Sequence, residues 1–91
     1  MSTPIILGAV VMTAAVADHV AQTGVRLSSY IDRHRNGDWG TLCDDDRATN
    51  QHAVEHGERV MSVYNNVGNA TIWIITEWDR SSTCVLFPSD Y

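Results

Sequence analysis

The fold of this chain is decided by its last third, which reads Thr71-Ile-Trp-Ile-Ile-Thr-Glu-Trp-Asp-Arg-Ser-Ser-Thr-Cys-Val-Leu-Phe-Pro-Ser-Asp-Tyr91. Two apolar, β-prone runs, Ala70–Thr76 and Thr83–Phe87, flank a short charged turn, Glu77–Ser82. The first run is apolar on both faces, which is typical of a central strand, and Pro88 ends the second. The pattern predicts two adjacent strands that hold polar groups at one end of a sheet.

Two further strands are predicted outside this pair. Glu58–Tyr64 alternates between two faces, and Asn65–Asn69 after it has strong turn chemistry. Near the start of the chain, Ile5–Met12 reads as a short buried strand. This strand either adds to an edge of the sheet or only leads into the helix that follows.

Three helices are predicted between the first strand and the meander. Thr13 caps the first, which ends near Gln22 before Gly24. The second covers Arg26–Arg35, with one buried stripe at helical spacing. The third begins at three acids, where the helix macrodipole favours negative charge, packs shallowly and ends at Gly57. The stripe residues are Leu27, Tyr30, Ile31 and His34; the acids are Asp44, Asp45 and Asp46.

The order β-α-α-α-β-β-β predicts an α+β fold in which three short helices pack on a small antiparallel β-meander. A length of 91 residues fits one domain covering 1–91. We expect a cytoplasmic protein, because two cysteines, Cys43 and Cys84, are not a disulfide framework, although their pairing is left open. The uncharged run Pro4–Ala17 lacks a basic start and is too short to span a bilayer, so we interpret it as neither an export signal nor an anchor.

The formal net charge is −5, with six arginines and no lysine. An acidic surface repels nucleic acid and anionic membrane, so we expect no direct nucleic-acid partner and no membrane partner. Such a surface suits a basic protein partner, for example a nucleic-acid-binding enzyme. Ordinary solubility is the simpler explanation of the same charge.

The charged turn is the first candidate site. Glu77, Asp79 and Arg80 could form a general acid/base pair with an anion-binding arginine. Alternatively, Asp79 caps the turn while Arg80 pairs with Glu77 or with a helix C-terminus. We favour the structural interpretation, because no nucleophile–base pair or metal motif accompanies the carboxylates. Trp78 either anchors an interface or folds back over the sheet as a lid.

Two other features were weighed as sites. His52 and His56 have the i, i+4 spacing of a zinc-binding helix, with His34 and Cys43 as further ligands, but no paired ligand motif is present. We therefore expect no metal and no cofactor. Trp39, between two glycines, is expected to fill the gap between helices and sheet.

Several motifs of the chain together resemble those of a group of small, uncharacterised bacterial, plasmid and phage proteins, some of which carry a restriction–modification label. The resemblance covers roughly Asn36 to Tyr91, and Trp78 stands where this family is expected to have a small residue such as alanine. It implies carriage by a mobile element and an anti-defence role, and it supplies no catalytic residues. A chain of 91 residues is too short for a methyltransferase domain with its cofactor site. The motifs are Gly37-Asp38-Trp39-Gly40, Asp46, Asn50, Arg59–Tyr64, Ile72–Glu77, Asp79-Arg80-Ser81 and Leu86–Tyr91.

Three functional hypotheses follow. The first is a non-enzymatic binding protein that inhibits a host defence nuclease complex of the anti-CRISPR or anti-restriction kind. Its surface would combine the acidic start of the third helix, Asp44, Asp45 and Asp46, with the turn residues Glu77, Trp78, Asp79 and Arg80. The second is a small ligand-binding or hydrolytic domain that uses Glu77, Asp79 and Arg80 with His56. The third is a homo-oligomeric accessory or antitoxin-like protein, such as a homodimer formed by edge pairing of the sheet.

Overall fold

The computed structural model describes residues 4–91 and confirms the predicted α+β class and element order. Three helices and four strands make up the domain. In chain order the elements are β1 (Ala9–Met12), α1 (Ala14–Thr23), α2 (Ser28–Arg35), α3 (Asp44–His56), β2 (Val60–Val67), β3 (Ala70–Thr76), β4 (Ser82–Leu86) and a 3-10 turn, η1 (Pro88–Asp90).

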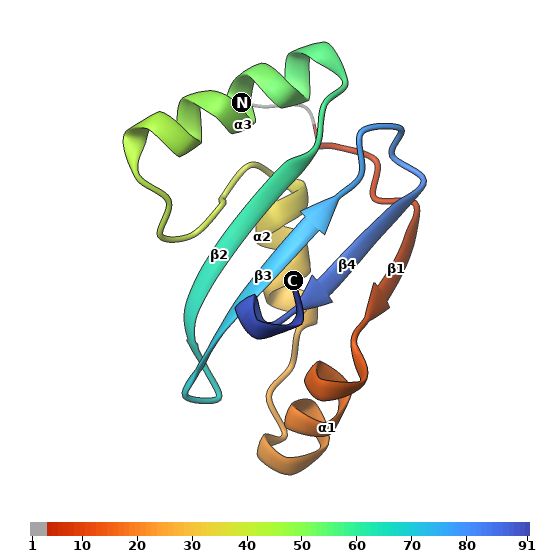
Figure 1. Cartoon of the computed structure of the whole chain (residues 1–91), viewed down its shortest axis with the longest axis vertical. Coiled ribbons are helices and arrows are strands. Elements are labelled where there is room, and N and C mark those ends of the chain that lie inside the picture. Colours follow the sequence, from red (N-terminus) through yellow and green to blue (C-terminus); the bar gives the residue numbers. More distant parts are fainter. Residues whose placement is uncertain (1–3) are drawn as a thin grey trace.

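The strands form one mixed sheet in the order β1-β4-β3-β2. β2, β3 and β4 make the predicted antiparallel meander, and β1 joins the edge parallel to β4, with Ala9 opposite Ser82. Figure 1 shows α2 behind the sheet and the C-terminal turn in front of it, while α3 crosses beyond the upper end of β2. Tyr91, at the end of this turn, packs its ring edge-on against Trp73 of β3.

The interpretation of Ile5–Met12 as a buried strand is wrong in length and in burial. Only Ala9–Met12 is a strand, at an edge of the sheet, and all four of its residues are exposed. The segment before it turns away, and the Ile5 N–H donates to the Arg35 carbonyl at the end of α2. Gly8 makes this bend at φ +64, where a Cβ would lie 2.3 Å from the Ser81 carbonyl oxygen.

The predicted turn at Asn65–Asn69 is shorter in the structure, because β2 continues to Val67. The strands β2 and β3 are joined by Gly68-Asn69, both with positive φ, as in the two-residue turns that match strand twist. Asn66, also at positive φ, lies in an irregularity of the register between Tyr64 and Val67. One asparagine therefore forms a bulge inside the strand rather than a turn after it.

The predicted helix ends are mostly confirmed. Thr13 accepts the Val16 N–H at the start of α1, and Gly24 and Gly57 end α1 and α3 in the left-handed conformation. α2 begins at Ser28, two residues later than predicted. α3 buries only two of its residues, Asn50 and Ala53, which confirms its shallow packing.

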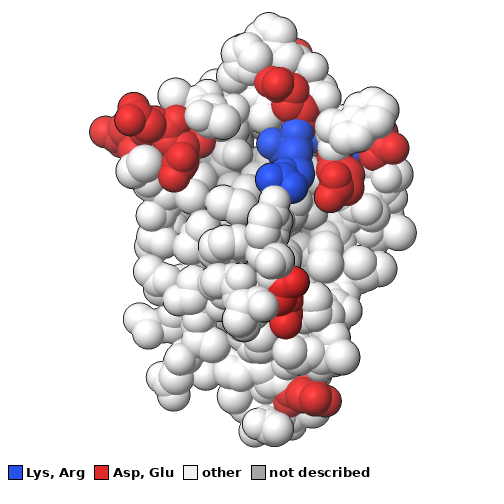
Figure 2. Space-filling model, in the orientation of Figure 1, with Lys and Arg blue, Asp and Glu red and all other residues white. Residues whose placement is uncertain are grey.

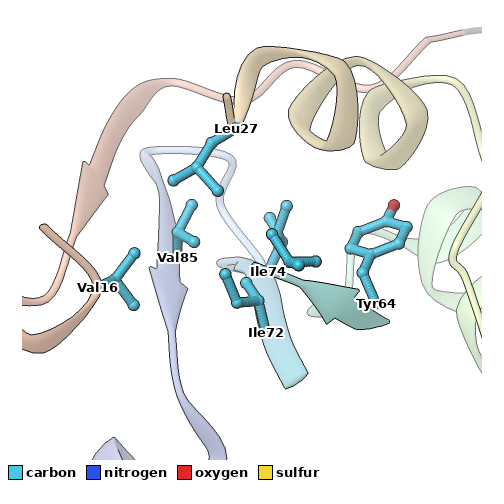
Figure 3. Packing of buried hydrophobic residues seen from close by; sticks show 7 residues of the cluster. Val16, Leu27, Tyr64, Ile72, Ile74 and Val85 are labelled. Carbon is cyan, nitrogen blue, oxygen red and sulfur yellow. The ribbon is translucent and has the colours of Figure 1, made fainter. Parts of the chain in front are cut away.

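The main hydrophobic core lies between the sheet and the helices α1 and α2. Val16 of α1 and Leu27 before α2 pack against Ile72, Ile74 and other residues on one face of the strands (Figure 3). A second cluster joins Trp39, Ala53 and Val60 beneath α3. The predicted packing role of Trp39 is thereby confirmed, and its indole Nε1 has no hydrogen-bond partner among residues 4–91.

The two edges of the sheet differ. Along β2, the edge is closed by the chain itself: Val63 donates to the Trp39 carbonyl and accepts from the Thr41 N–H. The Asn50 side chain continues this cover, donating to the Met61 carbonyl at 2.6 Å and accepting the Met61 N–H at 3.2 Å. Along β1, no segment of residues 4–91 lies beyond the strand (Figure 1).

In the part of the chain that the structure describes, no helix has the length and apolar character needed to cross a membrane.

Candidate interaction surface

The turn between β3 and β4 is held by its own backbone and side chains. Glu77 donates its N–H to the Ser82 carbonyl and accepts the Arg80 N–H at 3.0 Å. The Asp79 carboxylate accepts the hydroxyl of Ser81 at 2.6 Å and its N–H at 3.1 Å, and these bonds lower the pKa of Asp79. The predicted capping role of Asp79 is confirmed.

The guanidinium of Arg80 fastens this turn to the end of α3. It donates to the carbonyl of Glu58 at 2.5 Å, and to the carbonyls of Ala53 and Glu77 at 3.1 Å. Ala53 lies in the last turn of α3, and its carbonyl also accepts the N–H groups of Gly57 and Glu58. Pairing of Arg80 with a helix C-terminus, one of the two structural alternatives, is therefore observed. A guanidinium engaged in this way has few donors left for a bound anion.

Trp78 lies at the tip of the turn with 66% of its surface exposed. It therefore does not fold over the sheet as a lid. Glu77 before it is half-buried, while Asp79 after it is exposed. An exposed tryptophan on a turn fixed at both ends is a rigid apolar projection, and such side chains contribute strongly to protein interfaces.

The acidic start of α3 and the turn lie at opposite ends of that helix. Asp44, Asp45 and Asp46 are all exposed in the first turn of α3, while Arg80 holds the β3–β4 turn at the last. The two groups are roughly 15 Å apart along the axis, at 1.5 Å per residue. Figure 2 shows red side chains spread over the upper part of the molecule, at its left, top and right, around a blue patch. The structure thus brings the predicted residues to one end of the protein but not into one cluster.

We define the α3–turn surface as residues 40–59 together with residues 77–82. It contains seven carboxylates and three arginines, a net charge of −4 out of the −5 of the whole chain. Two of these arginines, Arg47 and Arg80, direct their guanidinium groups to backbone carbonyls. The ion pairs between arginine and carboxylate within residues 4–91 lie elsewhere, at Arg33–Asp38 and Arg35–Asp32. The negative charge of the protein is therefore concentrated on this surface.

Two hollows of the described chain are not built from the turn. One of about 180 Å³ lies between α3 and β2 and includes Asp46, Arg59 and Thr49 in its lining. A wider one of about 390 Å³ lies beside Arg33, Thr41 and Tyr64. Since neither contains Glu77, Asp79 or Arg80, these three residues do not converge on either hollow.

The histidines of α3 are arranged as a surface pair. The rings of His52 and His56 stack at 4.0 Å, the Nδ1 of His52 lies 2.6 Å from Glu58, and the Nδ1 of His56 lies 2.9 Å from the His52 carbonyl. Within residues 4–91, no group of three or more His, Cys, Asp and Glu side chains is placed to hold a metal ion. His34 of α2, weighed as a further ligand, is fully buried between that helix and the sheet.

Cys43 and Cys84 are free thiols and do not pair. Cys43 is exposed at the start of α3, whereas Cys84 is half-buried in β4. Burial raises the pKa of the Cys84 thiol, as does the negative charge of Asp90 and Glu77. A thiol with a raised pKa is a poor nucleophile at neutral pH.

A buried polar chain that the sequence analysis missed links α2 to three strands. Thr83 must donate its hydroxyl proton to the Leu7 carbonyl, because a carbonyl only accepts, and it therefore accepts from Thr76 at 2.8 Å. Thr76, with its proton used, accepts from Nε2 of His34 at 2.8 Å. The neutral ring has one N–H, so Nδ1 of His34 accepts the hydroxyl of Ser62 at 2.5 Å. This series of hydrogen bonds assigns His34 the tautomer that carries its proton on Nε2.

Burial lowers the pKa of His34 to about 4, and the positive charge of Arg80 adds to this effect. His34 is fully enclosed, so this chain positions α2 on the sheet and offers no access to a substrate. The sequence predicted that His34 is buried but not its partners, which lie on β2, β3 and β4. Strand alternation already put Ser62 on the face of Val60 and Tyr64, and a hydroxyl on a buried face was the available signal.

Comparisons of the chain with protein-family models, with curated proteins and with solved structures find no match.

Proposed function

We propose that this protein is a non-enzymatic binding protein that uses the α3–turn surface to block a basic, nucleic-acid-binding defence complex of the host, as an anti-CRISPR or anti-restriction inhibitor. The observation that carries the proposal is the concentration of charge: the α3–turn surface has a net charge of −4, out of −5 for the whole chain. Carriage by a mobile element, implied by the family resemblance, supplies the biological context.

The separation of the carboxylates supports binding to a groove rather than to a point. Acidic groups at both ends of α3, roughly 15 Å apart, match an extended basic surface better than a single cation. Attraction between such surfaces steers association and weakens with added salt. Trp78 adds an apolar contact beside the acidic residues of the turn.

The geometry of the turn supports binding over catalysis. Asp79 is exposed, its pKa is lowered, and it is occupied by Ser81, so it is a weak base at neutral pH. Arg80 is engaged by three backbone carbonyls. These contacts leave no pair of groups in this turn placed to exchange a proton with a substrate.

The first test is affinity purification of the tagged protein from its host, with mass spectrometry of the proteins retained at moderate salt. We expect a nuclease effector or a restriction subunit that leaves the resin as the salt concentration rises. Recovery of the tagged chain alone would contradict the proposal.

The second test is a pair of matched charge reversals, Glu55→Lys on α3 and Asp18→Lys on α1. Both residues are exposed on helices, and both substitutions change the net charge by the same amount. A lysine near the C-terminus of α3 suits the helix macrodipole, so α3 remains folded. We expect Glu55→Lys to weaken capture of the partner about tenfold, and Asp18→Lys to leave it unchanged. Equal effects of the two would show that total charge matters rather than the surface.

The triple reversal of Asp44, Asp45 and Asp46 to lysine tests the far end of α3. We expect loss of inhibition. Positive charge in the first turn disfavours the helix, so the helical circular dichroism signal is the control that the variant is folded. A folded variant with full inhibition would remove the acidic start of α3 from the interface.

A further inference from the structure

The free edge of β1 has backbone groups directed outward. Ala9 and Thr13 donate their N–H groups to the Ser81 and Val85 carbonyls on the β4 side. Because N–H and C=O directions alternate along a strand, those of Val10 and Met12 point away from the sheet. They are available to another strand.

The edge also lacks the usual protection against strand pairing. Natural edge strands carry charged residues, prolines or bulges, yet residues 5–17 are free of charge and of proline. The side chains along β1 are apolar and open to solvent: Val10 is 44% exposed, Val11 50% and Met12 44%. The β2 edge, in contrast, is covered by Trp39–Thr41 and by Asn50.

We propose that β1 is a dimerisation strand that pairs antiparallel with β1 of a second copy of this chain, joining two four-stranded sheets into one. In the register that uses both outward residues, Val10 of each copy exchanges backbone hydrogen bonds with Met12 of the other. Val11 then lies on the two-fold axis, opposite Val11 of the second copy.

The distribution of charge favours a second copy as the occupant of this edge. A basic partner is attracted to carboxylates. The acidic start of α3 lies on the β2 side of the sheet, away from β1 (Figure 1), and only the β3–β4 turn of the α3–turn surface reaches β1. Two copies with a charge of −5 each repel one another, and pairing through β1 places the acidic starts of their α3 helices at the two far ends. The contact itself is uncharged and self-complementary.

The same asymmetry limits the assembly to two copies. A chain with one free edge forms a closed dimer, whereas free edges on both sides would allow an open polymer. The paired strands are short, and the contact is smaller than the roughly 1,000 Å² expected of a stable interface, so exchange between monomer and dimer is reversible.

The test is sedimentation velocity of the full chain at concentrations from about 1 µM to about 1 mM, the range of weak association constants. We expect a shift from monomer to dimer with no larger species. A monomer throughout this range, or a series of larger oligomers, would overturn the proposal.

The first variant, Val10→Pro, removes an outward N–H that the monomer does not use. Proline is tolerated on edge strands with the N–H side facing solvent. Because the two-fold axis removes the donor from both copies, we expect at least a tenfold loss of association. Val10→Thr, which keeps the N–H, is the matched control and retains the dimer. Unchanged association of a folded Val10→Pro chain would overturn the pairing.

The second pair of variants tests the register. Val11→Lys and Val11→Glu each place like charges directly opposite one another across the axis, so each is expected to be a monomer. Mixing the two places opposite charges there and is expected to restore a mixed dimer. Failure of the mixture, when both variants are folded by circular dichroism, would contradict a register centred on Val11.

Discussion

At the scale of single residues, His34 determines the direction of a whole chain of hydrogen bonds. Its ring has one acceptor and one donor, and the carbonyl of Leu7 at the far end fixes which nitrogen is which. Protonation of the ring would require the Ser62 hydroxyl to turn away in a space without solvent. The buried, neutral form is therefore the one on which the contact between α2 and the sheet depends.

This residue makes stability depend on pH. The pKa of His34 is about 4 in the folded protein and near 6.5 in the unfolded chain. Between these values the unfolded chain binds a proton that the folded protein does not, so the free energy of unfolding falls as the pH falls from 6.5 to 4. The full loss is about 3 kcal/mol, and it is complete below pH 4.

Urea denaturation at several pH values from 7.5 to 4 measures this loss. His34→Gln keeps a polar side chain without a titrating group, so its stability should change little between pH 6.5 and 5. An identical slope in His34→Gln would show that another group causes the dependence.

At the scale of elements, Arg80 connects two segments that the sequence alone treats separately. Its guanidinium supplies donors to the last turn of α3 and to Glu58 in the segment before β2, so the β3–β4 turn and the helix support one another. The sequence offered two structural partners for this arginine, Glu77 or a helix C-terminus. The structure shows the C-terminus of α3, together with the carbonyl of Glu77 rather than its carboxylate.

We predict that Arg80→Ala lowers the free energy of unfolding by about 1–3 kcal/mol, because carbonyls of Ala53 and Glu58 lose a charged donor. Arg80→Lys retains the charge but has fewer donors, so its free energy of unfolding should lie between those of the original chain and of Arg80→Ala. Chemical denaturation followed by circular dichroism measures both. If Arg80→Ala weakened partner capture without loss of stability, the arginine would belong to the interface instead.

Local chemistry made some elements predictable from the sequence and left others out of reach. The ends of α1 and α3 followed from Thr13, Gly24 and Gly57, whose capping depends on neighbouring backbone only. The exposure of β1 and the bulge at Asn66 depend on contacts across the sheet, which periodicity does not contain. The candidate site shows the same division, since the role of Asp79 was local and the contact of Arg80 with α3 was long-range.

At the scale of the whole molecule, the sheet has two different edges and the surface has two different ends. The β2 edge lies next to α3 and is closed, while the β1 edge is uncharged and open. A basic partner bound at the acidic start of α3 and a second copy bound along β1 therefore use different edges of the sheet. On the closed edge, Asn50 is the side chain that covers Met61.

Asn50→Ala should remove the cover from Met61 and cost about 1–3 kcal/mol of stability, since its amide makes two part-buried hydrogen bonds. It also leaves the N–H and C=O of Met61 open on the β2 edge, so we expect species larger than a dimer at high concentration by light scattering. Gln51→Ala, at an exposed neighbour on α3, is the control for the helix. A dimer limit unchanged in Asn50→Ala would contradict the role of Asn50 in closing the sheet.

The parallel pairing of β1 with β4 also has a consequence during synthesis of the protein on the ribosome. β1 is made early but pairs with no strand until β4 exists, and Thr83 follows Leu7 by 76 residues. At about 5–20 residues per second, this apolar segment waits roughly 4–15 s for its place in the sheet. Throughout that interval the segment is open to binding by chaperones and by neighbouring nascent chains. The extent of such binding depends on how fast translation completes the last strand.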